Sequence, residues 1–136
     1  MKRLLLMTVI ALMTICLCAC GSDEESKTIS FETKGGYTGE VLTECPLDVA
    51  TATSSAISQL VPGSDTSKMA TQNFMATKYD NGMYEVSFQG VVIDGNEFGG
   101  EAYIELDGDK SSTHYLQVAN KEYLNDGIDL SEYDEK

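Results

Sequence analysis

The feature that most constrains the fold is an alternation of apolar and polar residues that repeats four times between residues 69 and 119. A period of two residues is typical of strands with one buried face. The runs are separated by turn signals with Asn-Gly or Asp-Gly, which supply the positive φ angles of tight hairpins. We therefore predict four consecutive antiparallel strands, at 69–79, 83–93, 98–106 and 113–119.

The alternation also assigns the side chains to two faces. Apolar residues such as Val86, Ile104 and Leu116 fall on one face, and we expect the opposite face to be exposed to water. That opposite face mixes acids with tyrosines, and tyrosine is favoured at binding surfaces, although it is also an ordinary strand residue. The candidate binding residues on it are Glu85, Gln89, Glu101, Tyr103, Glu105 and Tyr115.

Residues 46–61 carry the pattern of an amphipathic helix. Pro46 suits the first turn, and Pro62-Gly63 ends the helix. The apolar residues expected on one face are Leu47, Ala50, Ile57, Leu60 and Val61. Before the helix, residues 28–34 alternate like a short strand, and Gly35, Gly36 and Gly39 indicate a loop. After the four runs, the acidic tail 123–136 is expected to frame at most one short strand and to fray at its end.

These elements predict an α+β domain over residues 28–122, with one helix packed on a four- to five-stranded antiparallel sheet in two layers. The order of strand, helix and four strands resembles the cystatin-like architecture. The resemblance is one of element order alone, because the chain has no Gln-Val-Val-type loop and no Trp. It implies a fold and no activity.

The first twenty residues have the pattern of an export signal. Two basic residues precede the uncharged run 4–15, which is shorter than the roughly 20 residues that cross a bilayer and is typical of a signal h-region. The following residues, Leu17-Cys18-Ala19-Cys20-Gly21, resemble the lipobox of bacterial lipoproteins. The resemblance implies cleavage between Ala19 and Cys20 and a lipid on Cys20. The alternative is an ordinary secretory signal with a coincidental cysteine.

On the lipoprotein interpretation, residues 1–19 are a signal peptide and residues 20–27 are a lipidated, acidic tether. Two or more acyl chains, such as palmitate, hold a protein firmly on a membrane. We then expect the domain on the cell membrane or outer membrane, facing away from the cytoplasm. The acids after Cys20 resemble the surface-export signal of some Bacteroidetes lipoproteins, but they also suit a plain linker.

The charge excludes one class of partner. The whole chain has a net charge of −13, and removing residues 1–19 takes away two of the nine basic residues and none of the 22 acids, which leaves −15. No arginine remains to read phosphates or guanine. Nucleic acid is therefore excluded as a partner, and the acidity favours solubility or a cationic partner.

The nucleophilic residues are few. His114 is the only histidine, and Cys45 is the only cysteine outside residues 1–20, so we expect one free thiol. Cys45 precedes a helix, where a thiol pKa can be lowered, and a Cys45–His114 pair is the one nucleophilic arrangement available. Such residues are more often structural. A zinc site with three nitrogen or sulfur ligands cannot form within the chain.

The acidic turns 107–109 and 125–129 offer oxygen ligands for calcium, but neither matches the EF-hand loop, and turn chemistry explains their Asp and Asn residues. We expect no metal and no cofactor. The leading hypothesis is a non-catalytic interaction module whose partner is an envelope or exported protein. The alternatives are a lipoprotein that binds a small ligand or cation between helix and sheet and, last, an enzyme.

Overall fold

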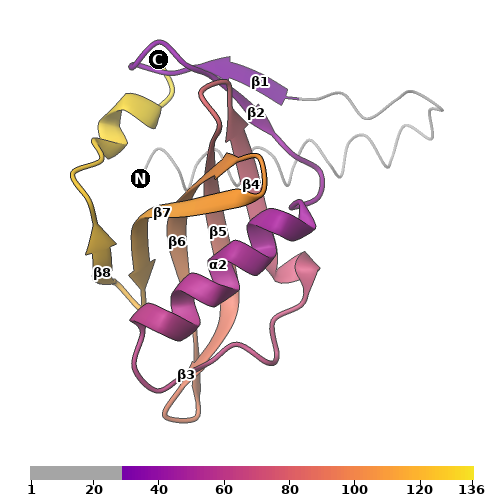
Figure 1. The fold of residues 1–136 in the computed structure, drawn as a ribbon, viewed down its shortest axis with the longest axis vertical. Helices are drawn as coiled ribbons and strands as arrows, with labels where there is room; N and C mark the ends of the chain where they lie inside the picture. Colours follow the sequence, from indigo (N-terminus) through magenta and orange to yellow (C-terminus); the bar gives the residue numbers. More distant parts are fainter. Residues whose placement is uncertain (1–28) are drawn as a thin grey trace, which may run out of the picture.

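The computed structural model describes residues 29–136 (Figure 1). The predicted signal peptide, Cys20 and the tether lie outside the described residues. The described chain forms one α-helix and one antiparallel sheet, which confirms the two-layer α+β class. The strands are β1 (Ile29–Glu32), β2 (Thr38–Val41), β3 (Ser64–Asp65), β4 (Phe74–Tyr79), β5 (Met83–Ile93), β6 (Asn96–Asp107), β7 (Lys110–Val118) and β8 (Lys121–Asn125). The helix is α2 (Leu47–Leu60), and two short 3-10 helices are η1 (Thr71–Asn73) and η2 (Leu130–Tyr133).

Strands β4 to β8 form a meander in the order of the chain, and β2 and β1 continue the sheet beyond β4. The short β3 pairs with the end of β5. The predicted run 83–93 coincides with β5, whereas β4 begins later than predicted because η1 occupies the preceding residues. The predicted number of strands was too low, because β2 and β3 had no alternating signal of sufficient length.

Strand β2 corrects the loop that its glycines indicated. Gly39 lies within β2 and pairs with Phe31 of β1. A Cβ at Gly39 would lie 2.5 Å from Cζ of Phe31, so the glycine makes room for an aromatic ring rather than for a turn. Glycine inside a strand often marks such a close approach.

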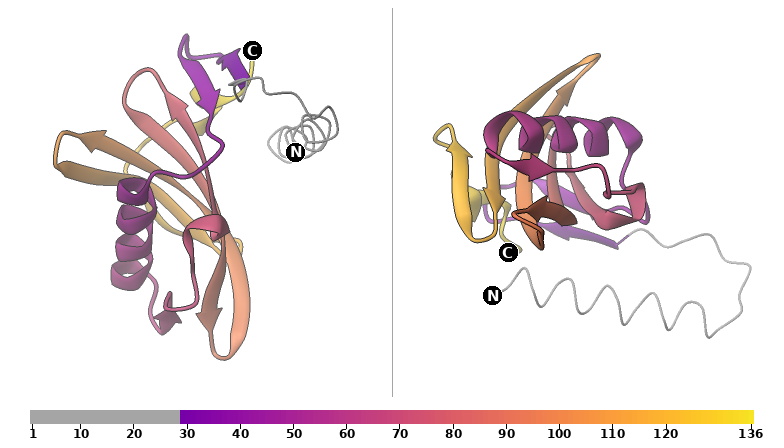
Figure 2. Two further views of the ribbon diagram at one scale, coloured as in Figure 1. Left: turned by 90° about the vertical axis from the view of Figure 1, so that its right-hand side faces the viewer. Right: turned by 90° about the horizontal axis from the view of Figure 1, so that it is seen from below.

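Helix α2 packs on one face of the sheet, across β5, β6 and β7 (Figures 1 and 2). Its buried positions are Val49, Ala50, Thr53, Ala56 and Ile57. The buried Thr53 hydroxyl donates to the carbonyl of Val49 at 2.7 Å, so no polar atom is left unsatisfied there. Leu47 and Leu60, which were predicted on the buried face, are the first and last residues of α2 and are 68% and 36% exposed.

The C-terminal segment, Asp126–Lys136, covers part of the other face of the sheet, which we call the outer face (Figure 2). Backbone hydrogen bonds join Lys34 N–H to the Asp134 carbonyl and Lys136 N–H to the Glu32 carbonyl, each at 2.9 Å. Between them, Thr33 and Glu135 form an antiparallel bridge. The expectation of a frayed end was therefore wrong, since this segment extends the sheet beyond β1 and packs on it.

Candidate functional site

Four of the six candidate binding residues lie in two rows that cross the strands on the outer face. The covered row contains Glu85, Tyr103 and Tyr115, which are successive cross-strand neighbours on β5, β6 and β7. The open row lies two residues further along each strand, toward the β5–β6 turn. Its members are Met75, Ser87, Glu101, Gln117 and Glu122, on five adjacent strands.

The covered row is part of a tyrosine cluster, which we define as Tyr79, Tyr103, Tyr115 and Tyr133. Glu85 accepts hydrogen bonds from the hydroxyls of Tyr79 and Tyr103, both at 2.9 Å. Tyr103 is 0% exposed and Tyr115 is buried as well. The expected exposure of these two tyrosines was therefore wrong, because the C-terminal segment lies over them.

Tyr133 holds the C-terminal segment on the sheet. Its ring stacks on Tyr37 at a centroid distance of 5.3 Å and contacts the ring of Tyr79 edge-on at 4.8 Å. The side-chain amide of Asn81 donates to the Tyr133 hydroxyl at 3.1 Å. Burial raises the pKa of Tyr133 although the Asn81 hydrogen bond lowers it, so the phenol stays neutral in the physiological range.

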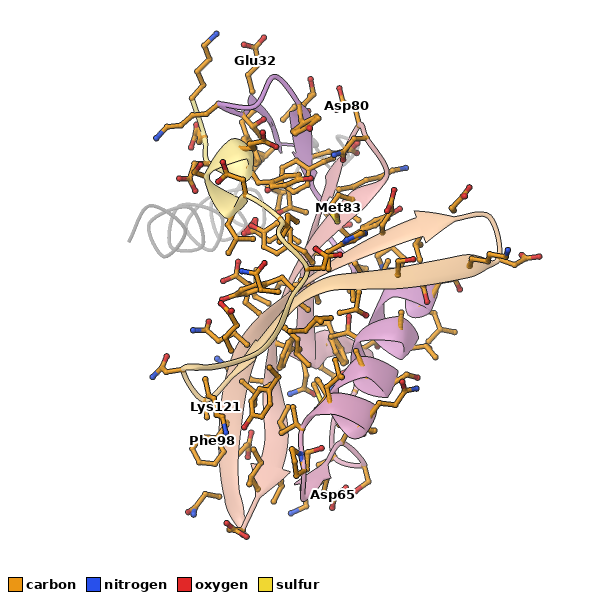
Figure 3. The ribbon with its side chains drawn as sticks, turned by 60° about the vertical axis from the view of Figure 1, so that its left-hand side comes forward. Glu32, Asp65, Asp80, Met83, Phe98 and Lys121 are labelled. Carbon is orange, nitrogen blue, oxygen red and sulfur yellow. The ribbon has the colours of Figure 1, made fainter. Side chains whose placement is uncertain are left out.

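The open row combines one exposed apolar side chain with polar groups. Met75 is 43% exposed, Glu122 is exposed, and the three residues between them are half-buried. Gln89 is exposed next to this row, just before a bulge at Gly90, whose φ is +98°. Of the predicted binding residues, the structure thus brings only Gln89 and Glu101 together on the part of the outer face that neither α2 nor the C-terminal segment covers. Figure 3 shows Phe98 and Lys121 toward this end of the sheet and Glu32 and Asp80 at the opposite end.

Glu105, the last predicted binding residue, pairs with the only histidine of the chain. His114 Nε2 lies 2.9 Å from Glu105 Oε1, and His114 Nδ1 lies 2.5 Å from Asp126 Oδ2. Burial lowers the pKa of His114, but the hydrogen bonds and charges of the two carboxylates outweigh it, and the net shift is upward. The alternating pattern missed this cluster because Asp126 belongs to the C-terminal segment.

Cys45 lies in the core beneath α2, and its thiol is free. Burial raises the pKa of Cys45 to about 11, the opposite of the lowered pKa that a reactive thiol needs. Among residues 29–136, Cys45 donates to the Pro46 carbonyl at 3.6 Å and forms no hydrogen bond with His114. The structure therefore does not bring the two nucleophilic residues together.

The acidic turn 125–129 uses side-chain oxygens within the turn itself. Asn125 Oδ1 accepts from the Gly127 N–H at 3.0 Å, and Asp129 Oδ1 accepts from the Ser131 N–H at 3.0 Å. In residues 29–136, no three His, Cys, Asp or Glu side chains are grouped closely enough to hold a metal ion. The hydrogen bond to Asn125 closes a turn, and the hydrogen bond to Asp129 caps η2.

Two grooves flank α2, the helix beside which the alternative hypothesis placed a ligand site. One, of about 570 Å³, lies between the helix and the β6–β7 hairpin, and the other, of about 470 Å³, lies between the helix and η1. Both are open, and both include the exposed Leu47 and the hydroxyl groups of Thr51 and Ser55. The larger groove also has charged residues in its lining, Asp48, Asp109 and Lys110.

No family model, no curated protein and no solved structure matches this chain. Within residues 29–136, the structure has no helix with the length and apolar character needed to cross a membrane.

Proposed function

We propose that this protein is a bacterial lipoprotein, held to a membrane of the cell envelope through Cys20, and that its domain is a non-catalytic module that binds an envelope or exported protein. The observation that carries the proposal is the open row. Its side chains lie on five adjacent strands of a rigid sheet, which neither α2 nor the C-terminal segment covers.

The composition of the open row suits a protein partner. Met75 offers an exposed, flexible apolar side chain that adapts to a partner surface. Ser87 and Gln117 offer hydrogen-bonding groups beside it, and Glu101 and Glu122 carry negative charge. Opposite charges across an interface favour specific association, so the preferred partner presents polar and basic groups around an apolar contact.

Two observations support a non-catalytic role. Both ring nitrogens of His114 face carboxylates, which leaves neither free to act on a substrate. The thiol of Cys45 is buried and protonated at neutral pH. Among the described residues, neither the histidine nor the cysteine is therefore available as a base or a nucleophile.

The proposed anchor restricts the reach of the domain. Strand β1 begins at Ile29, nine residues after Cys20. An extended chain spans at most about 3.3–3.6 Å per residue, so this tether reaches about 30 Å. The domain then stays close to the membrane surface, where it meets partners embedded in or passing through the envelope.

Site-specific photo-crosslinking in cells tests the interaction. A photo-reactive residue replaces Ser87 or Gln117 of the full-length chain, and the control places it at Gln59, exposed on α2. We expect one saturable adduct from the two open-row positions, none from the control, and loss of the adduct with Met75→Asp. Equal adducts from all three positions, or no adduct from anchored protein, would contradict the proposed surface.

Metabolic labelling with a palmitate analogue tests the anchor separately. Cys20→Ala is expected to abolish the label and release the protein from the membrane fraction. Cys45→Ala, which removes the buried thiol, is the matched control and is expected to keep both. Label retained in Cys20→Ala would show that the lipobox interpretation is wrong.

The groove between α2 and the β6–β7 hairpin supports a second candidate function, the binding of a small ligand. Its volume of about 570 Å³ lies within the usual range of ligand pockets. A ligand in this groove would raise the melting temperature, and Thr51→Trp, which fills the groove, would remove the shift. A screen of metabolites that leaves the melting temperature unchanged would contradict this candidate.

A further inference from the structure

The histidine cluster joins the root of the C-terminal segment to the sheet. The register between β6 and β7 shifts at Tyr103 and Ile104, so His114 is the extra residue of a β-bulge. There it lies between Glu105 of β6 and Asp126, the first residue of the C-terminal segment. The backbone N–H of Asp126 also donates to the His114 carbonyl at 3.1 Å.

The number of protons on the imidazole decides how many carboxylates it holds. A neutral imidazole has one N–H and one lone pair, whereas the imidazolium ion has two N–H donors. Both ring nitrogens of His114 lie within hydrogen-bonding distance of a carboxylate oxygen. Only the protonated ring donates to both, and loss of its proton leaves one carboxylate facing a lone pair.

Among residues 29–136, His114 is the one basic side chain that forms an ion pair with Glu105 or Asp126. Glu105 faces His114 from β6 and Asp126 faces it from the C-terminal segment, while Tyr133 of η2 is a further titratable group close enough to feel the charge of Glu105. The net shift of the His114 pKa is upward. The stabilisation from the protonated ring is therefore complete below the unfolded pKa of about 6.5 and is lost as the pH rises through the higher folded pKa.

We propose that His114 is a proton-controlled latch for the C-terminal segment. With the ring protonated, the latch holds Asp126 and Glu105 together and keeps the segment over the tyrosine cluster. With the ring neutral, the attachment at Asp126 weakens, the segment opens more often, and Tyr103 and Tyr115 become accessible. The latch requires neither the lipid anchor nor a partner, so it stands apart from the proposed function.

NMR of the full chain in detergent tests the latch directly. Because the chain has a single histidine, its ring protons report the titration of His114 without ambiguity. Hydrogen-exchange protection of the amides in 126–133, corrected for intrinsic rates, is measured between about pH 5 and pH 8. We expect the protection to fall about two- to fivefold, as suits a largely exposed ion pair, with the midpoint of the His114 titration.

Asp126→Asn removes the charge that the latch needs. We expect it to lower the His114 pKa and to make protection of the C-terminal segment independent of pH. The control Asp109→Asn makes the same charge change at the exposed tip of the β6–β7 hairpin and is expected to alter neither. Unchanged amide shifts on β5 would verify that each variant is folded. Protection that does not follow the His114 titration, or that keeps its pH dependence in Asp126→Asn, would overturn the proposal.

Discussion

Replacing Tyr133 with alanine removes the side chain that holds the C-terminal segment on the sheet. Tyr133 is only 6% exposed, and its ring contacts the rings of Tyr37, Tyr79 and Tyr103 at centroid distances of 5.3, 4.8 and 5.2 Å. The substitution therefore eliminates a buried ring and three aromatic contacts at once. We expect it to lower the free energy of unfolding substantially.

The magnitude follows from the burial of the ring. A buried aromatic side chain removes about 150–250 Å² from water, and at about 25 cal/mol per Å² this contributes about 4–6 kcal/mol as an upper bound. Measured losses for buried aromatic residues replaced by alanine are about 3–5 kcal/mol. The segment lies at the surface and can collapse partly onto the gap, so we expect about 3 kcal/mol. Tyr133→Phe loses only the hydrogen bond from Asn81 and should cost at most about 1 kcal/mol.

Urea unfolding, followed by tyrosine fluorescence because the chain has no tryptophan, measures these differences. With an m-value of about 1.5 kcal/mol/M, the Tyr133→Ala midpoint falls by about 2 M. Glu132→Ala, at the exposed neighbouring position, is the control and should stay within about 0.5 kcal/mol of the parent. A Tyr133→Ala midpoint equal to that of Glu132→Ala would refute the packing of the C-terminal segment.

Three further outcomes follow from other contacts. Gly100→Ala places a Cβ 2.0 Å from the Gln117 carbonyl oxygen inside the sheet, so thermal unfolding should show a loss of about 2–3 kcal/mol. Because burial raises the pKa of Cys45 to about 11, maleimide at neutral pH should label this thiol only after urea is added. Hydrogen bonds from the side chain and backbone of Ser131 lower the pKa of Asp129. The ionised Asp129 cap therefore stabilises η2 at pH values above the ordinary carboxyl pKa, and this stabilisation is lost as the pH falls through the lowered pKa. When the protein is titrated with acid and followed by tyrosine fluorescence, the change caused by protonation of Asp129 should be absent from Asp129→Ala.

Each of these outcomes has a result that contradicts it. A Gly100→Ala protein as stable as the parent would show that β6 and β7 are not paired at this position. Rapid maleimide labelling of Cys45 in the native state would place the thiol outside the core. An acid titration unchanged by Asp129→Ala would show that the Asp129 cap does not contribute to the stability of η2.

Local patterns predicted the meander because strands joined by short turns carry their own signals. Strand β5 was predicted residue for residue, and α2 was predicted to within one residue at each end. The three hairpin turns followed from Asn-Gly and Asp-Gly chemistry, with Gly82, Gly95 and Gly108 at positive φ. These features depend on residues close together in the sequence.

The remaining features depend on contacts between distant parts of the chain. The alternation assigned Tyr103 and Tyr115 to an exposed face, and this was wrong because a segment with no pattern of its own folds over them. The position of His114 also depends on distant residues, because the bulge at Tyr103 and Ile104 places its ring between two carboxylates. Neither the bulge nor the partner Asp126 is visible in a period-two pattern. Of the open row, Glu101 was predicted, and Gln89 was predicted beside it, but the extent of the row was not.

The bridge between Thr33 and Glu135 also sets the order in which the domain can be completed. It joins the residue that follows β1 to Glu135, which the ribosome adds after every strand of the sheet. Until those last residues have left the ribosome, this edge of the sheet lacks its outer neighbour and Tyr103 and Tyr115 lack their cover. The domain therefore completes this edge only after synthesis reaches the end of the C-terminal segment.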